Sequence, residues 1–295
     1  MGENKPLWVP SAERVAASAM TRFREYCAIR NAVDLPDHDA FQQWSVDARG
    51  AFWTDVWDFC GVRGDRGARD LVHGDVMLEA RFFPDASLNF AENLLSKSGP
   101  TDALVFRGED KVDYRWSWDH LHQMVSRLQQ AYRAMGIGKG DRICAMMPNM
   151  PETIACMLAA SSIGAIWSSC SPDFGEQGVI DRFGQIEPKL FVACDGYWYK
   201  DVAAKVRAVE PILNVPVLVV HYAGHAADLA ESLVGGRTLE QFIAPYEAGP
   251  VEFTRLPFSH PLYILFSSGT TGIPKCIVHS AGGTLLQHLK EHRFH

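Results

Sequence analysis

Hydrophobic and polar residues follow one spacing in the first part of the chain and another beyond residue 100. From residue 11 to about residue 60, apolar side chains return every three or four positions, which is the period of a helix. Ser11 stands before this stretch as an N-cap, and Gly61 ends it. The first positions at helical spacing are Val15, Ala19, Phe23 and Cys27.

Aromatic residues gather between positions 41 and 59 of the same region. Packing in a hydrophobic core is a far commoner role for such a set than a ligand-binding face. The run from 61 to 70, rich in glycine, arginine and aspartate, predicts a solvated loop. We therefore expect residues 1–95 to form a helical N-terminal cap. The aromatic residues are Phe41, Trp44, Phe52, Trp53, Trp57 and Phe59.

Short apolar runs alternate with amphipathic stretches from residue 100 onward. The predicted strands are 103–106, 112–116, 142–147, 165–169, 189–193, 216–221 and 262–266. The first two flank a turn and predict a hairpin, and helices are predicted after it over 117–136, from 149 onward, over 176–186 and over 202–209. Asn149 and Glu152 predict a capping box at the second of these helices, with Pro151 near its start. The strands are apolar on both faces, so we expect an α/β fold with a parallel sheet covered by helices.

One stretch without any charged residue, 153–172, is long enough to suggest a membrane span. Its apolar content is diluted by five serines and by Gly164, and Pro172 ends it. A buried helix followed by a buried strand explains the stretch better. We expect no membrane partner.

Composition narrows the class of protein further. A chain of 295 residues with 47% hydrophobic residues can bury a large core. Its net charge of −7 argues against a nucleic-acid or anionic-membrane partner, so any phosphate site must be local. Seven cysteines without a C-x-x-C pair indicate reduced, buried thiols. With no apolar leader at the N-terminus, these features predict a cytoplasmic protein.

The segment from Ile264 to Lys275 has the composition of a loop that holds a polyphosphate. A strand-like apolar run leads into hydroxyls and glycines, and a proline and a lysine close the loop. Glycine lets backbone N–H groups approach an anion, hydroxyls donate to phosphate oxygens, and lysine adds a charge. The alternative is a serine- and glycine-rich surface turn that binds nothing. The residues expected to bind are Ser267, Ser268, Gly269, Thr270, Thr271, Gly272, Pro274 and Lys275.

Other motifs are weaker. A Walker A loop would need glycine at Pro274 and a hydroxyl at Cys276, which disfavours a kinase or NTPase. His288 and His292 match an H-x-x-E-H zinc motif, but the third ligand that a zinc site needs is missing, and an exposed helix face explains the run without any metal. His279 is more typical of a structural histidine than of a substrate contact.

The loop resembles the phosphate-loop signature of the adenylate-forming acyl-CoA synthetase superfamily. Segments 87–95, 165–188, 256–262 and 276–284 also resemble, within that superfamily, the acetoacetate–CoA ligases. The likeness extends over nearly the whole chain beyond the first thirty residues. Cys276 replaces a glycine common in the superfamily, which is usual for the acetoacetate branch.

The resemblance implies an acid–thiol ligase whose substrates are acetoacetate, ATP and CoA, with Mg²⁺ as a cofactor. Acetoacetate would first form an acyl-adenylate, and CoA would then form the thioester, with release of pyrophosphate and AMP. This implies a place in ketone-body and lipid metabolism. Lys275 is the residue expected to be catalytic.

In related acetyl-CoA synthetases, the loops that match 172–175 and 195–200 line the CoA site. The resemblance therefore implies that Phe174, Gly175 and Lys200 contact CoA. The arginine that those relatives carry in the second loop is absent here. Ordinary turns at strand ends are the alternative.

The family also has a later aromatic-Gly-x-Thr-Glu segment, a ribose-binding aspartate and a mobile domain with a catalytic lysine. None of these motifs occurs before His295, so we expect residues 96–295 to be the first part of an AMP-binding domain. Two functions stay open: a ligase of acetoacetate or of another short-chain acid, and a non-catalytic nucleotide-binding fragment.

Overall fold

The computed structural model of the chain describes residues 7–109, 112–197, 200–267 and 272–294. The chain divides into two compact units. One contains the residues up to Ser87 together with those from Gly283 onward, and the other is Leu88–Gly282. The domain boundary suggested by the sequence, between residues 95 and 96, stays a prediction.

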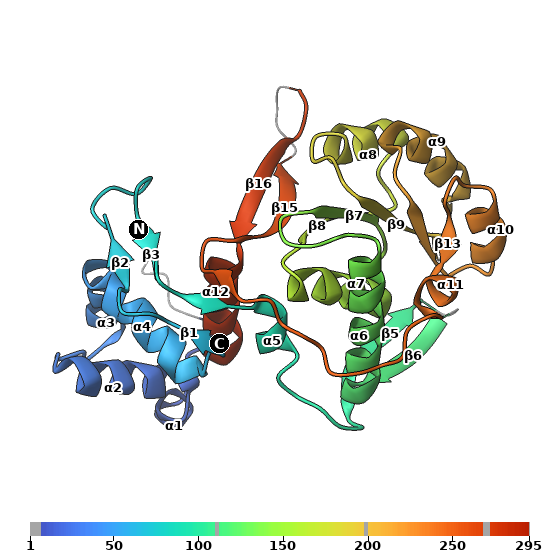
Figure 1. Cartoon of the computed structure of the whole chain (residues 1–295). Helices are drawn as coiled ribbons and strands as arrows, with labels where there is room; N and C mark the ends of the chain where they lie inside the picture. Colours follow the sequence, from blue (N-terminus) through green and yellow to red (C-terminus); the bar gives the residue numbers. More distant parts are fainter. Residues whose placement is uncertain (1–6, 110–111, 198–199, 268–271, 295) are drawn as a thin grey trace. The chain divides into compact units, whose positions relative to one another are not determined.

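Helices dominate the first unit, which carries the blue elements of Figure 1. They are α1 (Ala12–Ala16), α2 (Ala19–Asn31), α3 (His38–Asp47), α4 (Arg49–Cys60) and most of α12 (Ala281–Phe294). The short strands are β1 (Gly64–Asp65), β2 (Leu71–Val72) and β3 (Arg81–Phe82), of which β2 and β3 pair antiparallel. Gly61 ends α4 in the left-handed conformation, at φ 66°, as the sequence predicts.

The core of this unit is aromatic. Phe23 is fully buried, and its ring centre lies 4.2 Å from that of Phe294 and 5.1 Å from that of Phe59. The rings of Phe41 and Phe52 lie 5.9 Å from the same centre. Packing as the role of these rings is thus confirmed, and the last turn of α12 completes the cluster.

The helical spacing from Val15 to Cys27 does not belong to one helix. Ser11 caps α1 by accepting a 3.2 Å hydrogen bond from the backbone of Arg14, but the helix ends at Ala16. Ser18 then caps α2 with a second such bond, 3.1 Å from the backbone nitrogen of Thr21. Val15 stays exposed as a result. The second serine cap starts a new helix at this point, although the apolar spacing continues without a break.

The second unit alternates strands and helices. Its strands are β5 (Asp102–Gly108), β6 (Val112–Ser117), β7 (Arg142–Met146), β8 (Ile166–Cys170), β9 (Leu190–Cys194), β10 (Gly196–Tyr197), β11 (Lys200–Asp201), β12 (Val217–Val220), β13 (Arg237–Thr238), β14 (Leu256–Pro257), β15 (Pro261–Ser267) and β16 (Lys275–Ser280), and β4 (Ser87–Leu88) leads into it. Its helices are α5 (Phe90–Leu94), α6 (Trp118–Ala134), α7 (Pro151–Ser162), α8 (Glu176–Phe183), α9 (Ala203–Leu213), α10 (Ala226–Glu231) and α11 (Leu239–Ile243).

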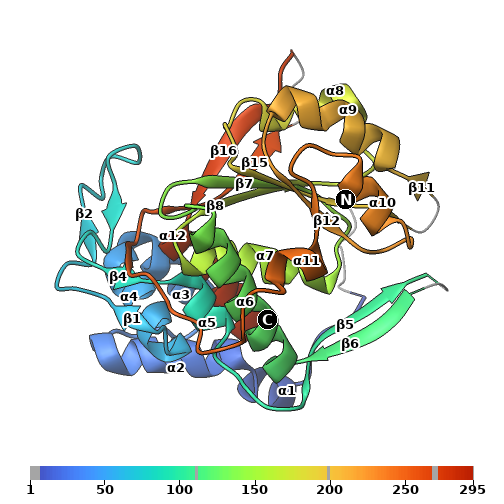
Figure 2. The same ribbon diagram turned by 45° about the vertical axis from the view of Figure 1, so that its right-hand side comes forward.

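Seven strands form one sheet in the order β13-β12-β9-β7-β8-β15-β16. All described neighbours pair in parallel except β15 and β16, which are antiparallel. Figures 1 and 2 show α6 and α7 on one face of the sheet and α8 and α9 on the other. The predicted α/β fold, with a parallel sheet covered by helices, is confirmed.

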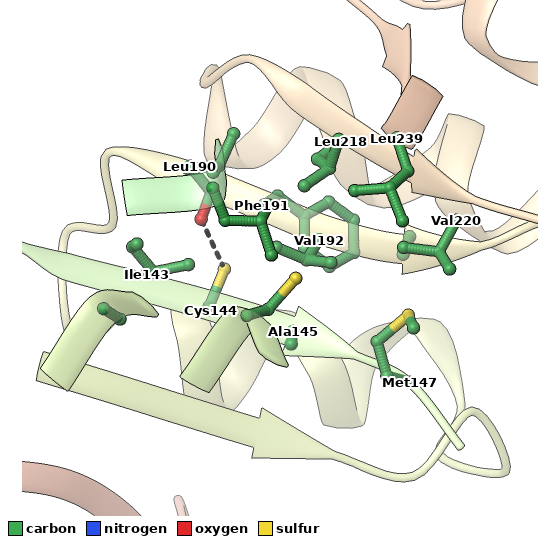
Figure 3. Close-up of a cluster of buried hydrophobic side chains, with 14 of the residues drawn as sticks. Ile143, Cys144, Ala145, Met147, Leu190, Phe191, Val192, Leu218, Val220 and Leu239 are labelled. Atoms are coloured by element: carbon green, nitrogen blue, oxygen red, sulfur yellow. Dashed lines mark hydrogen bonds between the residues drawn. The ribbon is translucent and has the colours of Figure 1, made fainter. Parts of the chain in front are cut away.

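The centre of the sheet is buried on both faces. Every residue of β9 and of β12 is buried, as expected for parallel strands between two helical layers. Figure 3 shows this core, in which Phe191 packs among the strands and the thiol of Cys144 donates to the carbonyl of Leu190 at 3.6 Å.

The buried side chain of Asn89, just before α5, links three segments of the second unit through hydrogen bonds. Its amide nitrogen donates to the carbonyls of Ser161, Ser162 and Thr254 at 2.9–3.1 Å. Its amide oxygen caps α5 by accepting from the backbone of Ala91 at 2.9 Å. Asparagine offers both donors and acceptors, so one side chain satisfies carbonyls at the end of α7 and a backbone N–H group at the start of α5.

The uncharged stretch 153–172 contains the rest of α7 and the strand β8, as predicted, and the first three residues of that strand are buried. Within the described residues, we find no helix whose length and apolar character suit a membrane crossing. The predicted capping box is wrong: Met150 is the N-cap of α7 and makes no side-chain cap. Glu152 instead accepts a 2.6 Å hydrogen bond from the hydroxyl of Tyr114 on β6.

Candidate functional site

The predicted phosphate loop connects the two strands at one end of the sheet. The strand β15 leads into the loop, and β16 leads out of it, with Ser267 paired to Lys275. Gly272 has φ 133°, a backbone conformation that side chains disfavour, so glycine is required there. The predicted binding residues Ser268, Gly269, Thr270 and Thr271 lie outside the described residues.

The two faces of this hairpin differ in chemistry. Side chains of paired residues in an antiparallel ladder share a face, and neighbours along a strand point to opposite faces. Ser267 and Lys275 therefore share one face, together with Leu265. Phe266 and Cys276, the next pair, lie on the other face.

The described residues at the hairpin tip are open to solvent. Ile273 is 68% exposed, and Gly272 and Lys275 are exposed as well. On the sheet below, an open pocket of about 270 Å³ is lined by residues that include Thr153 of α7, Trp167 of β8 and Tyr263 of β15. An exposed lysine beside backbone that only glycine tolerates is compatible with an anion that approaches from solvent.

The turn after α8 supports the other face of the hairpin. The side-chain nitrogen of Gln185 donates to the carbonyl of Pro274 at 2.9 Å. Its side-chain oxygen lies 3.8 Å from the thiol of Cys276, which donates to it. The residues before and after Lys275 are thus both held by one amide. The sequence alone does not reveal Gln185 as a support, because a glutamine in a polar turn gives no local signal.

The loop expected at the CoA site begins where β8 ends. Phe174 is 39% exposed, and the guanidinium carbon of Arg182 on α8 lies 4.1 Å from its ring centre. One face of the ring is therefore covered by a cation, and a base could stack only on the other face. Gly175 is the N-cap of α8 and has an ordinary φ of −64°.

The two loops expected to contact CoA lie together. The hydroxyl of Tyr197 donates to the carboxylate of Asp173, and the amine of Lys205 donates to the carbonyl of Pro172. Lys200 is the first residue of β11, paired with Tyr197. The strands β8, β9 and β15 run in parallel, so these loops and the phosphate loop share the carboxyl edge of the sheet.

Burial and charge at this edge affect the thiol of Cys170. Burial raises its pKa to about 12, although Arg182 and Lys205 act in the opposite direction. The thiol therefore stays protonated at neutral pH. Arg182 and Lys205 thus place two cations near the ends of these loops.

Asp195, directly after β9, organises the neighbouring loop. Its fully buried carboxylate accepts hydrogen bonds from four consecutive backbone N–H groups, those of residues 222–225, at 2.7–3.0 Å. Four such bonds are enough to satisfy a carboxylate in the absence of water. The sequence places Asp195 in a family-like loop but gives no sign of this role.

The weaker motifs fall into ordinary surroundings. His279 lies on β16 with its ring centre 5.1 Å from that of Tyr263. His288 and His292 lie on α12 with ring centres 6.3 Å apart. No group of three or more potential metal-binding side chains comes together among the residues that the structure describes.

An α/β domain, with loops gathered at the carboxyl edge of a mostly parallel sheet, is the class that this fold defines. The family model described as AMP-binding enzyme matches residues 93–294. The chain therefore belongs to the AMP-binding enzyme family.

Known proteins match over almost the whole chain. A protein from Rhizobium meliloti (strain 1021) named acetoacetyl-coenzyme A synthetase is 66% identical over 299 residues, which cover 100% of this chain and 46% of that protein. A solved structure of acetoacetyl-CoA synthetase from Streptomyces lividans matches with a TM-score of 0.89 and 35% identity, over 98% of this chain and 45% of that one. Malonamoyl-CoA synthetase vrtB from Penicillium aethiopicum is 36% identical, over 99% of this chain and 43% of its own length. The chain spans about half the length of the curated relatives it matches.

Proposed function

We propose that this chain is the part of an acid–thiol ligase that holds the phosphates of ATP while acetoacetate is activated. The observation that carries the proposal is the hairpin at the carboxyl edge of the sheet, where Lys275 is exposed and paired with Ser267. The resemblance to proteins named acetoacetyl-CoA synthetase supports acetoacetate as the acid.

The reaction needs two transfers, because a carboxylate is a poor electrophile. An oxygen of the carboxylate attacks the α-phosphorus of ATP, the bond to the bridging oxygen breaks, and pyrophosphate leaves. The thiolate of CoA then attacks the acyl carbon, and AMP leaves. Phosphoryl transfer of this kind depends chiefly on positioning and charge neutralisation.

We assign that work to the hairpin loop. Ser267, Gly272 and Lys275, with the predicted residues between them, would hold the β- and γ-phosphates and neutralise the departing pyrophosphate. Mg²⁺ would be held mainly by the phosphate oxygens, where it supplies further charge neutralisation. A loop between two paired strands can grip ATP and release pyrophosphate without disturbing the sheet.

We propose the neighbouring loops at the same edge as the CoA site. Phe174 would offer its uncovered face to the adenine, and Gly175 would offer its backbone at the start of α8. Lys200, with Lys205 nearby in sequence, would meet phosphates. We further propose a cytoplasmic enzyme that consumes ketone bodies in lipid metabolism.

The experiment follows the products formed from MgATP, CoA and acetoacetate. Release of AMP that depends on acetoacetate supports the ligase. Binding of MgATP without turnover favours the non-catalytic nucleotide-binding alternative, and release of ADP contradicts the proposal.

The relative named malonamoyl-CoA synthetase supports one competing acid, which the same assay can test. Acetate, acetoacetate and malonamate are supplied in parallel at equal concentration. Faster AMP release with malonamate than with acetoacetate would favour a ligase of another short-chain acid.

A further inference from the structure

Lys275 lies between two contacts made by a single side chain. On one side of it, the carbonyl of Pro274 accepts from Gln185 at 2.9 Å. On the other side, the thiol of Cys276 donates to Gln185 at 3.8 Å, a weaker bond. Gln185 follows α8, about ninety residues earlier in the chain, and its own backbone is held by the carbonyl of Arg182.

Gln185 contacts the face of the hairpin opposite to the one that carries the Lys275 side chain. Cys276 projects toward Gln185, so Lys275, the preceding residue of the same strand, projects toward the opposite face. Gln185 can therefore affect a phosphate only through the backbone that carries Lys275. It is a candidate positioning residue and not a catalytic one.

The same side of the hairpin has a further support. The guanidinium carbon of Arg182 lies 6.0 Å from the ring centre of Phe266, the partner of Cys276 across the ladder. Arg182 is itself fixed by a 2.6 Å hydrogen bond to the carbonyl of Gly178. The hairpin has no further strand beyond β16 among the described residues, so contacts from α8 and its turn limit how far it can bend.

We propose that Gln185 positions Lys275 for the polyphosphate by fixing the start of β16, the strand that leads out of the loop. This inference rests on the proposed function. Cys276 takes part because its thiol donates to Gln185, which adds a second contact to the strand that carries Lys275.

The test uses the 295-residue chain and two probes, MgATP and magnesium pyrophosphate. Gln185→Ala should weaken the binding of both probes by roughly threefold to tenfold, the range of the one or two hydrogen bonds lost to the hairpin. The side chain also donates to the carbonyl of Asp181 at 2.5 Å, so a fall of about 1 kcal/mol in the free energy of unfolding is expected as well. Gln185→Glu keeps the acceptor for Cys276 but turns a carboxylate oxygen toward the carbonyls of Pro274 and Asp181, which cannot donate, so a loss at least as large as in Gln185→Ala is expected. Gln177→Ala is the matched control, because Gln177 is exposed on α8 and its side chain donates to Asp181 of the same helix at 2.6 Å.

Equal affinity of wild type and Gln185→Ala for both probes would overturn the inference while leaving the proposed function intact. A wild-type chain that binds neither probe would instead overturn the proposed function and this inference with it. Alkylation of Cys276 by iodoacetamide, located by mass spectrometry, tests the contact without any ligand. Faster labelling in Gln185→Ala than in wild type supports the contact, and equal labelling argues against it.

Discussion

Ser168 on β8 donates a 2.8 Å hydrogen bond from its side chain to the backbone carbonyl of Ile264 on β15. The bond lies in a buried part of the sheet, where Ser168 is 1% exposed. Tyr263 and Trp167 are the described register pair between these two strands. A side-chain hydrogen bond therefore adds to the backbone pairing between β8 and β15, and β15 is the strand that leads into the predicted phosphate loop.

Replacing Ser168 with alanine should weaken the contact between β8 and β15. The carbonyl of Ile264 would lose its partner away from water, so we expect the free energy of unfolding to fall by about 1–3 kcal/mol. Urea denaturation measures the change. Ser169→Ala is the control, because the neighbouring Ser169 is exposed and should change stability by less than about 0.5 kcal/mol. Equal effects of the two variants would contradict the role of Ser168.

Replacing Asp195 with asparagine should disrupt the loop after β12. An amide keeps one acceptor oxygen but turns an NH₂ group toward N–H donors that now bond to the carboxylate. We expect a loss of about 3 kcal/mol in the free energy of unfolding, measured by thermal or urea denaturation. Asp181→Asn is the comparison, because its carboxylate accepts from Gln177 near the surface. A loss in Asp195→Asn no larger than in Asp181→Asn would argue against the buried carboxylate as the anchor.

The central strands could be predicted because their signal is local. The strands β9 and β12 are continuous apolar runs, and burial on both faces requires no more than that. No element is predicted for 275–280, where the structure has β16. The side chains of Ile277 and Val278 are 44% and 57% exposed on opposite faces, so this strand is specified by pairing with β15 and not by a pattern of burial.

Long-range partners explain what the sequence could not reveal. Glu152 has the right spacing for a capping box, but its carboxylate bonds to Tyr114, 38 residues earlier. The aromatic core of the first unit includes Phe294, from the other end of the chain. At the candidate site, the loop and its lysine follow from local composition, whereas the support from Gln185 depends on a tertiary contact.

His260 should make stability depend on pH. Burial lowers its pKa, with a smaller contribution in the same direction from Lys139, while the 2.9 Å hydrogen bond to the carbonyl of Gly164 opposes them. In the unfolded chain a histidine has a pKa of about 6.5. Below that pH the unfolded state binds more protons than the folded state, so the contribution of His260 is present above about pH 6.5 and is lost as the pH falls toward the folded pKa.

His260→Gln should therefore flatten the decline of the unfolding free energy between about pH 7 and about pH 5. Urea denaturation at several pH values measures the slope, and the comparison is with the wild type under the same conditions. His38→Gln, at an exposed position on α3, should keep the wild-type slope. The assignment fails if His260→Gln retains the full decline.

Lys275→Ala should weaken the binding of the triphosphate, because Lys275 is the exposed cation at the outgoing end of the hairpin. Loss of a charged donor from a phosphate site removes roughly 1.5–3 kcal/mol, which corresponds to a drop in MgATP affinity of about tenfold to a hundredfold. In a ligase that turns over, pyrophosphate exchange dependent on acetoacetate should fall more than thioester formation from a supplied acyl-adenylate, since pyrophosphate is present only in the first step. Lys189→Ala is the matched control: Lys189 pairs with Asp141 at 2.9 Å and directly precedes β9, at the opposite edge of the sheet. Undiminished exchange in Lys275→Ala would remove this lysine from the phosphate site, whatever the behaviour of the control.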